Sequence, residues 1–143
     1  MNRFLLLFIL NFVAVYEANA CSCVGFSLQE QFCHSDFVIK VKVEDVAKMN
    51  QSSILIYQVN ILETYKATDE AKSALQLKLL TTNPILGMCG LELQRDQVAV
   101  VGGKIINGQP NIGICYLHIR NSGEIEAQET NLRENFVKSC VSA

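Results

Sequence analysis

Six cysteines constrain the fold of this chain more than any other feature of its sequence. They stand at positions 21, 23, 33, 89, 115 and 140, all downstream of a segment that looks like a secretory signal. Exported compartments oxidise thiols, so an even number of cysteines predicts three disulfides. A Cys21–Cys23 bridge is disfavoured, because residues two apart in an extended chain lie near the Cα–Cα limit of about 7 Å. Spacing alone does not choose among the other pairings.

Residues 1–20 have the features of a signal peptide. A basic residue precedes an almost wholly apolar run at residues 4–15. That run is too short to cross a bilayer of about 30 Å as a helix. Ala18 and Ala20 form the small-x-small pattern after which signal peptidase cleaves. We therefore expect a secreted, extracellular protein without a membrane span, whose mature chain begins at Cys21.

Composition and motifs exclude several function classes. Lysine and arginine number 12 against 14 acidic residues, and the formal net charge is −2. Without a basic cluster, the chain is a poor ligand for nucleic acid. We find no His-Glu-x-x-His, no Gly-x-Ser-x-Gly and no phosphate-binding glycine loop. If every cysteine is bridged, no thiolate nucleophile remains. We expect one domain over residues 21–143, no enzymatic activity and no cofactor of its own.

Helices are predicted at both ends of this domain. Ser27-Leu28-Gln29-Glu30 is a capping box, which predicts a helix from Leu28 to His34. Near the C-terminus, apolar residues recur every four positions, which predicts a second helix fastened by its last cysteine. They are Leu132, Phe136 and Cys140.

Strands fill the region between the two helices. Apolar and polar residues alternate with period two over residues 37–43, 55–65 and 75–79. An apolar run at residues 98–101 leads to Asn107-Gly108, a strong hairpin signal, and residues 112–117 provide a returning strand. Five or six short strands with little room for crossovers favour a small antiparallel barrel, with an open sandwich as the alternative.

A possible glycosylation site lies between the first two predicted strands. Asn50-Gln51-Ser52 is an N-glycosylation sequon within a polar turn. We expect Asn50 to be accessible there, and the sequon alone leaves its occupancy open.

A mature chain that begins at Cys21 would carry a free α-amine beside the carbonyl of the same residue. These two groups can close a five-membered chelate ring on a metal ion. A catalytic zinc keeps three protein ligands and an exchangeable water. A terminus of this kind could therefore occupy the open position of a zinc that belongs to another protein.

Several short motifs follow one another in a recognisable order. Cys21-Ser22-Cys23 opens the mature chain, and Phe32-Cys33-His34-Ser35-Asp36 precedes an alternating basic strand. Further matches are Met88-Cys89-Gly90, Val101-Gly102-Gly103-Lys104, Cys115 and Cys140. Together they resemble the N-terminal domain of the tissue inhibitors of metalloproteinases.

This resemblance implies a mainly β, netrin-like domain over residues 21–143: a five-stranded, OB-like Greek-key barrel with short flanking helices. By cysteine order it implies the bridges Cys21–Cys89, Cys23–Cys115 and Cys33–Cys140. The sequence ends three residues after the last cysteine. We therefore expect it to lack the second domain of the longer relatives.

The resemblance also implies an inhibitor of zinc metalloendopeptidases, of the matrix metalloproteinase or adamalysin type, that acts as a monomer. Cys21 would bind the protease zinc through its amine and carbonyl oxygen. Ser22 would enter the primed-side specificity pocket. The implied contact ridge comprises Cys21, Ser22, Cys23, Val24, Gly25, Met88, Cys89, Gly90 and Leu91.

Two alternatives remain open. A netrin-like module could bind an extracellular signalling or matrix protein without inhibiting a protease, and many such modules carry extra residues before their first cysteine. A lipid-modified bacterial cysteine at position 21 is the other alternative. Ala18 in place of the usual leucine, together with five further cysteines, argues against it.

Overall fold

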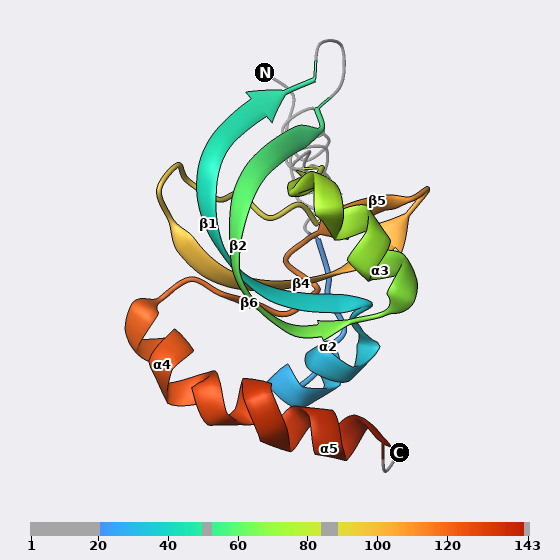
Figure 1. The fold of residues 1–143 in the computed structure, drawn as a ribbon, viewed down its shortest axis with the longest axis vertical. Helices are drawn as coiled ribbons and strands as arrows, with labels where there is room; N and C mark the ends of the chain where they lie inside the picture. Colours follow the sequence, from blue (N-terminus) through green and yellow to red (C-terminus); the bar gives the residue numbers. More distant parts are fainter. Residues whose placement is uncertain (1–20, 50–52, 84–88, 142–143) are drawn as a thin grey trace, which may run out of the picture.

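The computed structural model describes residues 21–49, 53–83 and 89–141 (Figure 1). The predicted signal peptide, Asn50 and Met88 lie outside these ranges. In chain order the elements are α2 (Leu28–His34), β1 (Phe37–Lys48), β2 (Leu55–Ala67), α3 (Asp69–Ala74), a 3₁₀ turn (Leu75–Leu77), β3 (Leu79–Thr82), β4 (Val98–Ile106), β5 (Gln109–Ile112), β6 (His118–Ile119), α4 (Ser122–Thr130), a π-helical segment (Asn131–Asn135) and α5 (Phe136–Val141).

Five strands close into a barrel in the order β1-β2-β3-β5-β4, because β4 pairs back onto β1. The pairing of β3 with β5, through Thr81 and Asn111, is parallel, and the other pairings in the barrel are antiparallel. The short strand β6 adds to β4 at Val100 and Val101. The expected OB-like barrel is confirmed, and the open sandwich is excluded.

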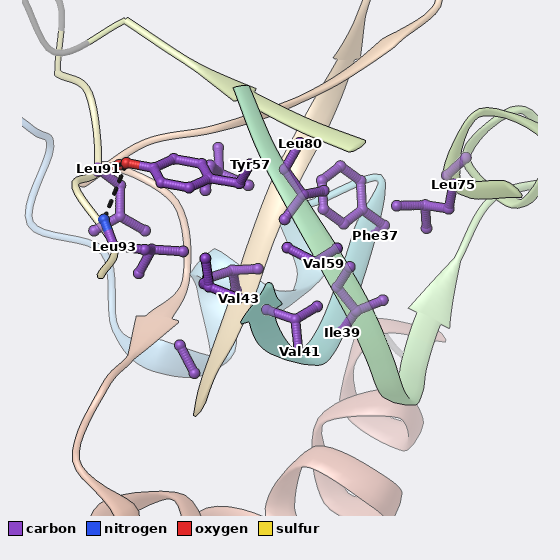
Figure 2. Close-up of a cluster of buried hydrophobic side chains, with 14 residues drawn as sticks. Phe37, Ile39, Val41, Val43, Tyr57, Val59, Leu75, Leu80, Leu91 and Leu93 are labelled. Carbon is purple, nitrogen blue, oxygen red and sulfur yellow. Dashed lines mark hydrogen bonds between the residues drawn. The ribbon is translucent and has the colours of Figure 1, made fainter. Parts of the chain in front are cut away.

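Strand β1 is buried on both faces at its start, which the alternating pattern did not predict. Phe37, Ile39 and Val41 point into the barrel and are fully buried (Figure 2). Val38 points the other way and is equally buried, because the helices cover the outer face there. Each such side chain contributes about 1.5–3 kcal/mol when removed from water. The strand therefore joins two hydrophobic clusters.

The second cluster lies between the barrel and the helices α2, α4 and α5, which gather at one end of the molecule in Figure 1. Leu132 and Phe136 are buried there, which confirms the four-residue repeat. The Cys33–Cys140 disulfide then joins α2 to α5, with a Cα–Cα distance of 5.3 Å. Within the described part of the chain, no helix is long and apolar enough to cross a bilayer.

Helix α2 begins and ends at the predicted residues. The Ser27 side chain accepts a hydrogen bond from the Glu30 N–H, and the Glu30 carboxylate accepts one from the Ser27 N–H. At the other end, Lys66 Nζ donates to the carbonyls of Phe32 and Cys33, at 3.0 and 2.7 Å. These contacts fix the helix that follows the N-terminal segment.

The expected strand at residues 75–79 is wrong for most of its length. Thr68 caps α3 by accepting a hydrogen bond from the Ala71 N–H, and the helix continues into the 3₁₀ turn. Lys78 then adopts a left-handed φ of 54°, and the strand begins only at Leu79. Alternating leucines fit a strand or a tight helical turn, so the pattern was ambiguous.

The hairpin after β4 is confirmed, but its returning strand is not where the sequence predicted it. Asn107 and Gly108 both have positive φ, 51° and 73°, as a two-residue type I′ turn requires. β5 therefore starts immediately at Gln109 and ends at Ile112. The apolar run at residues 112–117 mostly follows the strand instead of forming it.

Gly103 is a close contact point in the barrel wall. A Cβ there would lie 2.1 Å from the Asn111 carbonyl oxygen and 2.6 Å from the Phe37 ring. We predict that Gly103→Ala lowers the free energy of unfolding by about 2–3 kcal/mol, through overpacking. Gly25→Ala is the matched control, since no atom lies within 4 Å of a Cβ at that position. Equal urea midpoints for the two variants would contradict this account.

Candidate functional site

Two neighbouring disulfides fasten the N-terminal segment, which precedes α2 and has no regular secondary structure. Cys21 bonds Cys89 and Cys23 bonds Cys115, each with a Cα–Cα distance of 5.2 Å. With Cys33–Cys140, these are the pairings that the family resemblance implied. The Cys21 and Cys115 Sγ atoms lie 3.7 Å apart. Both bridges therefore hold residues 21–23 at one point on the barrel, and all six cysteines are bonded.

Backbone contacts position Cys89 for its disulfide to Cys21. Its carbonyl oxygen accepts a hydrogen bond from the Ile114 N–H at 2.9 Å, and Gly90 pairs with Gly113 as an isolated antiparallel bridge. A Cβ at Gly113 would lie 2.6 Å from that carbonyl oxygen, so only glycine permits this approach. Cys89 itself has a left-handed φ of 54°. Cys89, to which Cys21 is bonded, is thus held in place by backbone hydrogen bonds to the barrel.

A buried hydroxyl on β3 holds the segment that follows Cys89. Thr82 is fully buried; its Oγ1 accepts a hydrogen bond from the Leu91 N–H at 2.9 Å and donates to the Ile112 carbonyl at 2.8 Å. These bonds tie the segment after Cys89 to the end of β5. The sequence pattern did not single out Thr82, because a threonine in a strand carries no signal of such a role.

A second hydroxyl fixes the next turn of the loop. Tyr57 donates to the Leu91 carbonyl at 3.3 Å. It also accepts a hydrogen bond from the Leu93 N–H at 3.0 Å, which Figure 2 shows as a dashed line. Burial raises the pKa of the Tyr57 hydroxyl, which keeps the group protonated and able to donate. Leu91 was expected in the contact ridge, but its side chain is 1% exposed and belongs to the core. That side chain is therefore unavailable to a partner.

The remaining described residues of the expected ridge lie together. Ser22, Val24 and Gly25 are exposed, and Val24 is 71% exposed. Cys21 and Cys89, which form the anchoring bridge, are half-buried. We call residues 21–25 together with Cys89 and Gly90 the N-terminal ridge.

The Ser35-Asp36 pair of the recognised motif supports the barrel next to the ridge. The Ser35 hydroxyl donates to the Gln31 carbonyl at 2.7 Å. The Asp36 carboxylate accepts hydrogen bonds from Lys104 Nζ and from the Ile105 N–H, both at 2.9 Å. Partial burial raises the pKa of Asp36, but these bonds outweigh it and hold the pKa below its usual value. Asp36 therefore stays ionised and couples α2 to β4.

We predict that Thr82→Val destabilises the fold and loosens the loop at Leu91. The substitution keeps the volume but leaves the Leu91 N–H and the Ile112 carbonyl without their partner, at a cost of about 2–3 kcal/mol. Amide exchange at Leu91 should accelerate markedly, as measured by NMR. Thr64→Val, on the exposed face of β2, is the control. Unchanged exchange at Leu91 would show that the hydroxyl does not hold the loop.

Comparison with known proteins agrees with this geometry. The family model described as tissue inhibitor of metalloproteinase matches residues 19–142. A relative named "Tissue inhibitor of metalloproteinase", from Drosophila melanogaster, is 34% identical over 98 residues, which cover 68% of this chain and 45% of the relative.

Proteins named "Metalloproteinase inhibitor 3" match at lower identity. The one from Scyliorhinus torazame is 26% identical over 68% of this chain and 46% of its own length. The one from Xenopus laevis is 25% identical over 86% of this chain and 58% of its own length. The chain thus spans about half the length of the curated relatives it matches. The family match, the barrel and the three bridges agree: this chain belongs to the tissue inhibitor of metalloproteinase family.

Proposed function

We propose that this chain is a secreted inhibitor of zinc metalloproteinases, of the matrix metalloproteinase or adamalysin type, and that it binds them through the N-terminal ridge. The observation that carries the proposal is the placement of Cys21: it is bonded to Cys89 at the start of an exposed segment. The names of the relatives support the same activity.

The zinc in this mechanism belongs to the protease. A catalytic zinc with three protein ligands holds an exchangeable water at its open position. Cleavage after Ala20 would leave Cys21 with a free amine, which together with the carbonyl oxygen replaces that water. An α-amine has a reference pKa of about 7.7–8.0, so a neutral fraction exists at physiological pH. Zinc binding draws on that fraction, because only the neutral amine has a lone pair.

Preorganisation gives the ridge its advantage over a flexible peptide. Ordering a mobile terminus on binding would cost affinity. Here Cys21 and Cys23 are each bonded to the barrel, and Cys89 is held by the Ile114 N–H. The ridge therefore enters the cleft already shaped. Exposed Ser22 has the small polar side chain expected to fit varied primed-side pockets.

The decisive experiment blocks the amine without touching the fold. We predict that acetylating the Cys21 amine, or adding one alanine before it, raises the inhibition constant about 100-fold or more against a matrix metalloproteinase catalytic domain. The same alanine added at the C-terminus is the control. Thermal unfolding should be unchanged in all forms, since the disulfides stay intact.

Two results would contradict the proposal. One is full potency of the acetylated or extended chain, which would mean that the amine does not bind the zinc. The other comes from sequencing the N-terminus of the protein secreted by expressing cells. A start several residues before Cys21 would favour the alternative of a non-inhibitory binding module.

A further inference from the structure

A hollow of about 270 Å³ lies directly beside the N-terminal ridge. Ser22, Cys23 and Val24 line one side of it, so the ridge and the hollow share a wall. Phe26, His34 and Tyr116 are among the residues that line the remainder. A protein that covers the ridge along Ser22–Val24 would therefore also cover the mouth of the hollow.

Two of the residues that line the hollow expose large apolar side chains to water. Val24 is 71% exposed and Phe26 is 40% exposed, and both are among the large hydrophobic side chains left open to water. The Phe26 and His34 rings lie 5.1 Å apart between centroids. Exposed apolar groups clustered at a concave site are typical of surfaces that bind another molecule.

The hollow is formed before any partner arrives. Gln31 Nε2 donates to the Phe26 carbonyl at 3.1 Å, and the Phe26 N–H donates to the Val24 carbonyl at 2.7 Å. The capping box at Ser27 fixes the next residue of the segment at the start of α2. Hydrogen bonds therefore hold the Phe26 backbone on both sides, and its ring lies against the ring of His34.

Charge at the hollow does not favour an ionic ligand. Lys104 is the lysine that lines it, and its Nζ is paired with the Asp36 carboxylate at 2.9 Å. The cation is thus compensated within the molecule. An apolar group would gain more from this site than an anion, because the gain comes from removing the Val24 and Phe26 surfaces from water.

We propose that the hollow receives an apolar side chain from the rim of the target protease's cleft, and that Phe26 thereby helps to determine which metalloproteinases the chain binds tightly. This inference rests on the proposed function, since it uses the ridge as the interface. The volume of the hollow, about 270 Å³, accommodates one leucine- to phenylalanine-sized side chain. The occupant belongs to the protease, because the ridge that borders the hollow is the surface proposed to contact it.

The test measures inhibition constants against a panel of metalloproteinase catalytic domains. Phe26→Ala should raise the constant about tenfold for the enzymes that fill the hollow, within the range of a single interface anchor. Phe26→Leu should restore most of the affinity by keeping an apolar wall. Leu77→Ala is the matched control: Leu77 is 76% exposed and does not line the hollow. It should leave every constant unchanged.

Phe26→Ala could weaken inhibition by distorting the segment around it, so a second variant changes the hollow in another way. His34→Trp leaves Phe26 in place and fills the hollow, so it should weaken inhibition of the same enzymes that Phe26→Ala affects. If both variants leave all constants within about twofold of the parent, the hollow is not part of the interface. If both weaken every enzyme equally, the hollow does not set selectivity, and that part of the inference fails.

Comparing the acetylated chain with the two hollow variants tests this inference and the proposed function separately. Loss of inhibition on acetylation, with no effect of Phe26→Ala or His34→Trp, would retain zinc chelation and refute the role of the hollow. Retained inhibition on acetylation, with a tenfold effect of both variants, would support the interface and refute chelation. Absence of inhibition by the parent chain would refute both.

Discussion

The bond between Cys21 and Cys89 is the constraint on which the N-terminal ridge depends. It joins the first residue of the described chain to a loop that the barrel itself holds in place, through Gly90, Gly113 and the Ile114 N–H. The second bridge, from Cys23 to Cys115, prevents the segment from pivoting about the first. These two covalent links, two residues apart, fix the shape of an exposed segment that has no regular secondary structure.

The barrel supports that surface through a few buried polar groups. The hydroxyls of Thr82 and Tyr57 bind the backbone at Leu91 and Leu93 and so fix the loop that carries Cys89. Polar groups placed within a hydrophobic core are costly unless every one has a partner, and here each hydroxyl has two. The core therefore contributes directly to the geometry of the ridge.

Features governed by local chemistry could be predicted from the sequence. The capping box at Ser27 gave the bounds of α2, Asn107-Gly108 gave the hairpin, and the period-two pattern gave β1 and β2. Cysteine order alone could not give the disulfide pairing, which came from the resemblance to a family. The structure has that same pairing.

Features governed by tertiary contacts could not be predicted in the same way. Leu75 and Leu77 fit a strand pattern, but Thr68 caps a helix that carries them into a 3₁₀ turn. Leu91 follows Cys89-Gly90 and was placed on the ridge, yet the buried hydroxyls of Thr82 and Tyr57 draw it inward. No short-range signal marks either hydroxyl, because their partners lie between 9 and 36 residues away in the sequence. The hollow beside Phe26 likewise exists only once α2 and β4 are folded together.

A crystal structure of the processed chain bound to a metalloproteinase catalytic domain would test the central claim most directly. The quantity to measure is the distance from the protease zinc to the amine nitrogen and carbonyl oxygen of Cys21. This account predicts both atoms at coordination distance, about 2.0–2.2 Å, with the zinc-bound water displaced. A complex in which the zinc keeps its water and Cys21 lies away from it would contradict the account.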